Sequence, residues 1–242
     1  MKELLRAEGL TKRYGPIKAV DGIDLDLAAG DVLAIFGPNG AGKSSLLHML
    51  AGTARPTSGR VTLGDGARAD GGGAPIGRGL LSHSGFLYGQ LSAEENLRFY
   101  GRLHGLKRTE ARVSEQLERV GLAGRAGSRV SELSHGMKRR LALARCLLHE
   151  PEIVLLDEPY TGLDPSAARL LRGILDELRD GRRSIVLVTH NLTQGLAMAT
   201  RVAICVRGRF AWEGERAELP SDPLLFYHHV VDGGGVSRAS RG

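Results

Sequence analysis

Apolar residues at the start of the chain follow the period of strands and then that of a helix. Residues 3–36 predict short strands, because apolar side chains nearly alternate with polar or acidic ones before the continuous apolar run at 32–36. A glycine-rich segment follows at once, and residues 44–50 predict a helix that ends near Gly52. A strand, a glycine-rich loop and a helix are therefore expected in this order.

The middle of the chain has helical periodicity. Ser92 and Glu95 have the spacing of a capping box, which predicts that a first helix begins there. Thr109 is placed to cap a second helix, which has an apolar stripe and ends at Gly121. A third helix is expected at about 135–149. Together these helices form a block that interrupts the strands.

Strands and helices alternate again in the last third of the chain. Asp164 and Pro165 are typical of a helix start, and Gly181 is typical of a position past a helix end. The other expected elements are a strand at 152–157, a strand at 184–189, a short helix near 192–199 and a hairpin at 202–212. The pattern predicts an α/β fold with an inserted helical block.

Two segments predict no regular structure. Residues 64–79 are rich in glycine and poor in apolar residues, which predicts a flexible surface loop. No helix-opening Lys-Ser pair follows these glycines, so a phosphate-binding role is not expected for them. Residues 233–242 are expected to be disordered.

Composition is that of an ordinary globular protein. The 242 residues are 42% hydrophobic and 25% charged, which allows one sizeable core with a small subdomain. No apolar run approaches the roughly 18 residues that a membrane-spanning helix needs, and the N-terminus lacks the apolar segment of a secretory signal. We therefore expect a cytoplasmic protein, unless a membrane partner holds it at the membrane.

Charge and cysteine content narrow the choice of partners. The net charge of +6 comes mostly from arginines, and a basic surface can bind nucleic acid or anionic lipid or can simply be solvated. No basic segment is interleaved with aromatic residues, so no nucleic-acid partner is expected. Cys146 and Cys205 lie in apolar segments without further ligands at metal-binding spacing, which predicts buried packing residues.

Residues 37–44 carry the first candidate chemistry. They fit the pattern G-x-x-x-x-G-K-[ST] at every fixed position, in the strand–loop–helix context that a phosphate loop requires; a chance glycine-rich turn would lack this context. In such loops backbone N–H groups converge on phosphate oxygens, Lys43 can reach the β- and γ-phosphates, and the Ser44 hydroxyl can ligate Mg²⁺. The predicted nucleotide-binding residues are Gly37, Pro38, Asn39, Gly40, Ala41, Gly42, Lys43, Ser44 and Ser45.

Two acidic residues follow a second apolar run. Residues 153–156 predict a buried strand, and Asp157 and Glu158 stand at its carboxyl end, where α/β sheets bind ligands. We expect Asp157 to hold Mg²⁺ together with Ser44, and Glu158 to polarise the attacking water. An acid pair can also begin a helix, but Pro159 follows directly here.

Two further segments point to a family. The string VSELSHGM at 130–137 opens a helix, and His190 ends the strand at 184–189. Each is a weak signal alone, since a histidine at a strand end is more often a turn residue. Their order relative to Lys43 and Asp157 resembles that of the ATP-binding cassette (ABC) ATPases, over residues 3–220.

This resemblance implies a role for each motif. Residues 37–45 match the Walker A loop of the family, residues 153–158 its Walker B strand and catalytic glutamate, and His190 its switch histidine. Tyr14 is similar to the aromatic residue that stacks on adenine, or else is a strand-end residue that packs on the sheet, and Gly162, Leu163 and Asp164 match the D-loop. The signature motif, usually LSGGQ, corresponds to Leu133, Ser134, His135, Gly136 and Met137.

The resemblance also implies fold, cofactors and partners. The expected fold is a P-loop NTPase of the ABC type, with a RecA-like core, an antiparallel β subdomain and a helical subdomain at about 86–149. The cassette would span 1–220, with an extension at 221–242. Two copies pair head to tail and enclose ATP and Mg²⁺ between the Walker A loop of one and Ser134 and Gly136 of the other. Their closure drives a polytopic membrane subunit, which places the chain peripherally at the cytoplasmic face of the membrane.

One departure from the family concerns a glutamine that touches Mg²⁺ and the attacking water. Alignment of the segment before the helical block puts His83 at this position, while Gln90 lies later than the pattern requires. His83 is thus a candidate catalytic and metal-site residue. Because histidine changes charge near neutral pH, we expect hydrolysis to be more pH-sensitive between about pH 6 and 7.5 than in a glutamine-bearing relative.

A narrower resemblance concerns the exported substance. LSAEENLRFYGRLHG and the stretch from LSHGM to the D-loop are similar to the haem exporter ATPases of cytochrome c maturation, with drug, lipid or polysaccharide exporters as the alternative. Soluble cassette ATPases of DNA maintenance usually carry coiled-coil or zinc insertions, and those of translation need two cassettes. A P-loop protein without turnover would not need Glu158 and His190.

Overall fold

The computed structural model describes residues 2–64 and 77–233. Most of the glycine-rich segment at 64–79 and nearly all of the tail at 233–242 therefore lie outside the described residues. Gly77 forms a turn and a strand already begins at Arg78, so the loop ends earlier than its glycine content predicts.

The N-terminal strands form an antiparallel sheet. Its strands are β2 (Ile17–Ala28), β1 (Glu3–Tyr14) and β4 (Ser58–Leu63), in this spatial order. Strands at the start of the chain are thus confirmed, although the first two are long and form a hairpin. Alternating apolar residues bury one face of this sheet against helix α1 (Lys43–Leu50) and the central sheet.

The central sheet contains the strands that precede the glycine-rich loop, His83, the two acids and His190. Its order is β5 (Arg78–Leu81), β6 (Ile153–Asp157), β7 (Ser184–Val188), β3 (Val32–Phe36), β8 (Arg201–Val206) and β9 (Arg209–Glu215), and only β9 runs antiparallel to its neighbour among these described strands. In β6, Val154 and Leu156 join the core beneath the helices, while Ile153 and Leu155 join the core beneath the antiparallel sheet. Burial on both faces explains the continuous apolar runs in the sequence.

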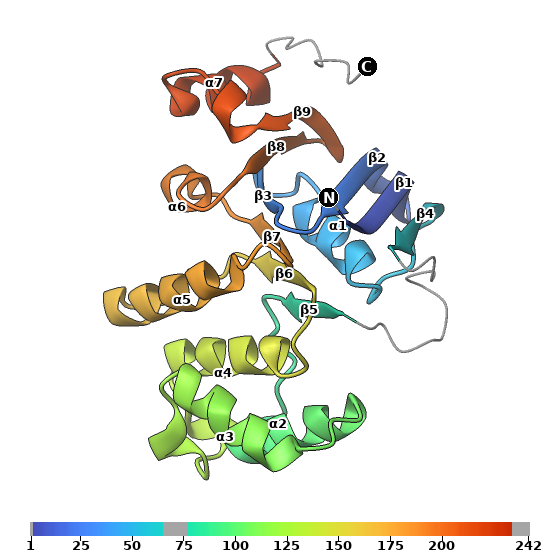
Figure 1. The fold of residues 1–242 in the computed structure, drawn as a ribbon. Helices are drawn as coiled ribbons and strands as arrows, with labels where there is room; N and C mark the ends of the chain where they lie inside the picture. The colour runs from blue at the N-terminus through green and yellow to red at the C-terminus, as the bar shows by residue number, and fades with distance from the viewer. Residues whose placement is uncertain (1, 65–76, 234–242) are drawn as a thin grey trace.

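Helices pack on the central sheet, and a group of helices lies beyond its β5 end. Besides α1 they are α2 (Ala93–Leu103), α3 (Thr109–Arg119), α4 (His135–Leu147), α5 (Pro165–Leu178), α6 (Leu192–Leu196) and α7 (Pro223–Val231). Figure 1 shows α2, α3 and α4 together below β5, at the end of the molecule away from α7. This arrangement agrees with the ABC-type α/β fold, while the subdomain limits at 86, 149 and 220 stay predictions.

Local helix signals were mostly right. The capping box at α2 is confirmed, since Ser92 accepts from the Glu95 amide and Glu95 accepts from the Ser92 amide. The cap at Thr109 is wrong: Thr109 is the first helical residue, and its hydroxyl donates to the Leu106 carbonyl instead. Helix α7 was not predicted at all.

Burial confirms the prediction for the cysteines. Cys146 and Cys205 are both fully buried, and burial raises the pKa of Cys146 to about 12 and that of Cys205 to about 11. In the described part of the chain, no helix combines the length and apolar character needed to cross a membrane.

Candidate functional site

The predicted phosphate loop and the predicted catalytic residues come together at the carboxyl ends of neighbouring strands of the central sheet. The glycine-rich loop follows β3, Asp157 ends β6 and Glu158 follows it, His190 follows β7, and His83 follows β5. These four strands are neighbours and run parallel, so their carboxyl ends face the same crevice. Stretches that are far apart in the sequence thus form one site.

The glycine-rich loop wraps around its own lysine. The Lys43 ammonium donates to the carbonyl oxygens of Gly37 at 2.7 Å and Pro38 at 2.9 Å, and the side chain is buried. Burial lowers the pKa of Lys43, and the negative charges of Glu158 and Asp157 act in the opposite direction. The lysine is therefore within electrostatic range of both acids at the end of β6.

The helix that follows the loop begins without a side-chain cap. Gly42 occupies the N-cap position with φ 98°, and glycine has no side chain that could accept from the first turn of α1. Helices α2, α4 and α5, in contrast, are capped by Ser92, Ser134 and Asp164. The first N–H groups of a helix need acceptors, and a phosphate supplies them together with the charge that the helix dipole favours.

The other loop residues divide into anchored and exposed ones. Pro38, Asn39, Gly40 and Ser44 are exposed, whereas the Ala41 carbonyl accepts from the Gly208 amide at 2.9 Å. The back of the loop is therefore fixed to the turn between β8 and β9, and its open side can receive phosphates.

Two side chains at the carboxyl end of β7 hold the Glu158 carboxylate. Thr189 donates to one carboxylate oxygen at 3.2 Å, and His190 contacts the other through Nδ1 at 2.9 Å. A carboxylate can only accept, so this contact requires a hydrogen on the Nδ1 atom of His190. The backbone of Glu158 is left-handed, with φ 47°, a strained conformation that is typical of functional sites.

The side chains that would hold Mg²⁺ fit a nucleotide-bound ion. No three His, Cys, Asp or Glu side chains gather into a metal cluster in residues 2–64 and 77–233. Mg²⁺ at phosphates takes one or two protein oxygens beside phosphate and water oxygens, which suits the Ser44 hydroxyl and the Asp157 carboxylate. The nitrogen donor of His83 suits this hard cation less well than it suits a hydrogen bond to water.

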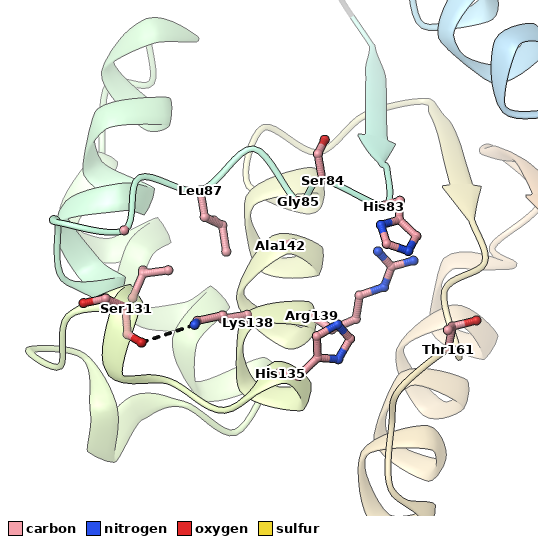
Figure 2. Close-up of a pocket in the computed structure, with 12 residues that line it drawn as sticks. His83, Ser84, Gly85, Leu87, Ser131, His135, Lys138, Arg139, Ala142 and Thr161 are labelled. Carbon is pink, nitrogen blue, oxygen red and sulfur yellow. Dashed lines mark hydrogen bonds between the residues drawn. The ribbon is translucent and has the colours of Figure 1, made fainter.

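His83 borders a cavity between the segment that follows β5, helix α4 and Thr161. The cavity has a volume of about 350 Å³, and its lining includes His83, His135, Arg139 and Thr161. Figure 2 shows His83 and His135 on either side of the Arg139 side chain. His83 itself is exposed, in the turn after β5, whereas Gln90 is exposed farther along, beside the start of α2.

The signature residues lie at the start of α4. Leu133 is buried, and the Ser134 hydroxyl caps the helix by accepting from the Met137 amide at 3.2 Å. A Cβ atom at Gly162 would lie 2.6 Å from the His135 ring, so this histidine lies against the D-loop of its own chain. Gly136 and Met137 are half-buried.

Asp164 and Tyr14 lie outside this cluster of contacts. Asp164 caps α5 by accepting from the Ala167 amide at 2.8 Å, as its sequence position predicts. Tyr14 ends β1 with 51% of its surface exposed, and the Lys12 ammonium lies 5.2 Å from its ring centroid. The ring therefore does not pack into the core, and its face is accessible from one side.

Comparison with known families agrees with this geometry. The ABC transporter family matches residues 20–161, which include the phosphate loop, the signature turn and both acids. The chain belongs to the ABC transporter family. It is an ATP-hydrolysing cassette of the ABC type.

Relatives of this cassette cover most of its length. It is 38% identical over 221 residues to the daunorubicin resistance ATP-binding protein DrrA3 of Streptomyces coeruleorubidus, a match that covers 90% of this chain and 70% of that protein. It is 36% identical over 222 residues to the Nod factor export ATP-binding protein I of Cupriavidus metallidurans, over 90% of this chain and 73% of that protein. The dimeric structure of MJ0796, a bacterial ABC transporter cassette, has a TM-score of 0.79 and 25% identity, over 88% of this chain and 99% of that one.

Two residues of this cassette site, Thr189 and Arg139, were not predicted from the sequence. Thr189 is buried and donates to Glu158, and its position directly before His190 at a strand end was a usable signal. Arg139 is buried in α4 and donates to the backbone of Asp157 and Glu158. An arginine within a helix gives no such signal in the sequence.

Proposed function

We propose that this cassette is the energising subunit of an ABC exporter, which pairs with a second cassette and drives polytopic membrane subunits. The observation that carries this proposal is the Glu158 carboxylate, held by Thr189 and His190 at the sheet edge that also presents the phosphate loop. A glutamate in this place can polarise a water molecule for attack on the γ-phosphate. Phosphoryl transfer otherwise needs mainly positioning and charge neutralisation, which the loop supplies.

Each residue of the site has a task in this proposal. The first N–H groups of α1 and the Lys43 ammonium bind the phosphates, and Tyr14 stacks on adenine. Bound Mg²⁺, held by Ser44 and Asp157, would neutralise charge on the phosphate oxygens. His190 orients Glu158 and reaches the γ-phosphate. Pro38, Asn39 and Gly40 lie on the exposed side of the loop, where a nucleotide would be received.

A second copy completes the site in this proposal. Ser134 and Gly136 lie at the start of α4, where the helix N-terminus favours a phosphate. The similarity to a cassette that forms a dimer supports pairing of this kind. We expect His135 and Met137, which replace the usual glycine and glutamine, to alter the affinity within the pair more than its geometry.

Export of a drug or of a Nod factor-like compound is favoured over export of haem. One relative described above is a daunorubicin resistance protein and another a Nod factor export protein, and neither name refers to haem. Haem export therefore stays a narrower prediction without support from these relatives. The peripheral location at the cytoplasmic face of the membrane follows from the proposed partner.

Purification from membranes tests the exporter proposal. A tagged chain, produced in its own host and extracted with detergent, should co-purify with a polytopic membrane protein, and the complex should hydrolyse Mg-ATP. A host strain that lacks the chain should become more sensitive to the exported drug, and the parent chain should restore resistance. Absence of any polytopic membrane protein from the detergent-extracted, purified sample would contradict the proposal.

Tyr14→Ala is expected to weaken ATP binding by about 1–3 kcal/mol, the usual contribution of an aromatic ring stacked on a base. Titration with a fluorescent ATP analogue measures the change. Tyr88→Ala is a matched control, because Tyr88 is similarly exposed but precedes α2. Equal affinities of the two variants would make Tyr14 a surface residue of the strand end.

His83→Gln is expected to flatten the dependence of ATP turnover on pH between about pH 6 and 7.5, since glutamine does not change charge in this range. Initial rates at saturating Mg-ATP across this range measure the effect. His228→Gln is the control, because His228 lies on α7, at the far end of the molecule from α4 (Figure 1). An unchanged profile in His83→Gln would remove His83 from the catalytic set.

A further inference from the structure

The Arg139 guanidinium lies at the junction of three segments of the site. Only 9% of the Arg139 surface is exposed, and the side chain extends from α4 toward His83 (Figure 2). One terminal nitrogen donates to the Ser82 carbonyl at 2.8 Å. The other donates to the Asp157 carbonyl and, at 2.8 Å, to the Glu158 carbonyl. A single side chain thus joins α4 to the carboxyl ends of β5 and β6.

These contacts fix the backbone on which Glu158 depends. The Glu158 amide donates to the Val188 carbonyl at 2.9 Å, so β7 holds one side of this residue. Arg139 holds the other side by donating to the Glu158 carbonyl. The Glu158 backbone is left-handed, a conformation that residues other than glycine rarely adopt. Two hydrogen bonds therefore fix the Glu158 backbone, and with it the direction in which the carboxylate points. One joins it to β7, and the other joins it to a side chain of α4.

The charge of the guanidinium is compensated locally. Burial lowers the pKa of Arg139, and the charges of Asp157 and Glu158 oppose this effect. A buried arginine that lost its acceptors would be costly, which favours a fixed arrangement of all three carbonyls. We expect the link between α4 and Glu158 to be rigid for this reason.

The same helix begins with the signature turn. Ser134 caps α4, and His135, one helical turn before Arg139, lies against Gly162 of the D-loop. In the proposed pair, the start of α4 contacts the ATP of the second copy, while Arg139 holds the catalytic glutamate of its own copy. Arg139 is therefore a direct link from the signature helix to the backbone of Glu158.

We propose that Arg139 is a positioning residue that orients the Glu158 carboxylate. Through Arg139, hydrolysis in one copy depends on how the α4 helix of that copy contacts the ATP bound to the other copy. The inference rests on the proposed function of Glu158 as the group that polarises water. It differs from a purely structural role, in which Arg139 would only satisfy buried carbonyls. The neighbouring arginine on α4 provides the comparison for that role.

Arg140 is a matched control for Arg139. Its guanidinium donates to the carbonyls of Val120 at 2.8 Å and Gly121 at 3.1 Å, within the helical block and away from Glu158. Arg139→Gln and Arg140→Gln therefore both remove a guanidinium of α4 that donates to backbone carbonyls. Only Arg139→Gln removes a contact to the end of β6, where Glu158 lies.

Steady-state hydrolysis of Mg-ATP by the full chain tests the proposal. Arg139→Gln should lower kcat by about 10²-fold with little change in KM, because misplacing a catalytic group by about 1 Å has this effect. Arg140→Gln should lower the unfolding temperature comparably but keep kcat near that of the parent. Arg139→Lys, which keeps the charge, should restore part of kcat. It also keeps the test valid if Arg139→Gln does not fold, since it should then show reduced kcat at parental KM.

A double-mutant cycle separates action through Glu158 from independent effects. In a Glu158→Gln background, Arg139→Gln should cause little further loss of single-turnover hydrolysis. An equal fold-loss in both backgrounds, or equal kcat in the Arg139→Gln and Arg140→Gln chains, would overturn the positioning role. Parental turnover of Glu158→Gln alone would instead overturn the proposed role of Glu158, whatever Arg139 does.

Discussion

Glu158→Gln is expected to slow ATP turnover by about 10²-fold or more while ATP binding is retained, because the amide keeps the shape of the carboxylate but cannot take up a proton. Its carbonyl oxygen can still accept from Thr189 or His190, which hold the carboxylate at 3.2 Å and 2.9 Å in the parent chain. The nucleotide then stays intact between paired cassettes. Phosphate release measures turnover, and size-exclusion chromatography with ATP should show a trapped dimer.

Glu152→Gln is the control for this substitution. Glu152 precedes the opposite end of β6, where it is exposed and forms an ion pair with Lys2 at 3.2 Å. Such exposed pairs contribute little, so neither turnover nor binding should change. Turnover of Glu158→Gln at the parental rate would show that another group activates the water.

Gly42→Ala is expected to cause the largest loss among substitutions in the phosphate loop. Gly42 has φ 98°, and an added Cβ would lie 1.9 Å from the carbonyl oxygen of Ala19 in β2. Left-handed strain and steric overlap together should lower the free energy of unfolding by about 3 kcal/mol. ATP binding should be lost as well, because relief of the overlap requires the loop to move away from β2.

Gly40→Ala separates the two causes. Gly40 also has a positive φ of 79°, but nothing lies within 4 Å of an added Cβ. This variant should lose only the strain, about 1 kcal/mol. Urea unfolding gives both stabilities, and titration with Mg-ATP gives both affinities. Equal losses in the two variants would mean that contact with Ala19 is unimportant.

Elements with strong local signals could be predicted from the sequence. The capping box at Ser92, the cap at Asp164 and the turn at Gly208 depend on a few adjacent residues, and all three occur in the structure. Thr109 failed because a residue that can cap a helix can equally be its first residue. Helix α7 was not predicted, although Asp222 and Pro223 form an ordinary helix start.

Some residues and contacts of the candidate site could likewise be predicted from the sequence, and others could not. Lys43, Asp157 and His190 could be named from motifs, because their chemistry requires particular residues next to particular strands. The contact between His190 and Glu158 could not, since it depends on β6 and β7 being neighbours in the sheet. Arg139 was unpredictable for the same reason, because its acceptors are backbone atoms, which leave no trace in the sequence.

By itself, the sequence determined that this protein has a phosphate loop between a strand and a helix, two acids at a strand end, and the motif order of an ABC cassette. These features follow from local periodicity and residue chemistry. Only the tertiary structure decided that Thr189 and His190 hold Glu158, and that Arg139 joins the signature helix to it. The physical reason is that strand order and helix packing bring distant backbone carbonyls within reach of one guanidinium.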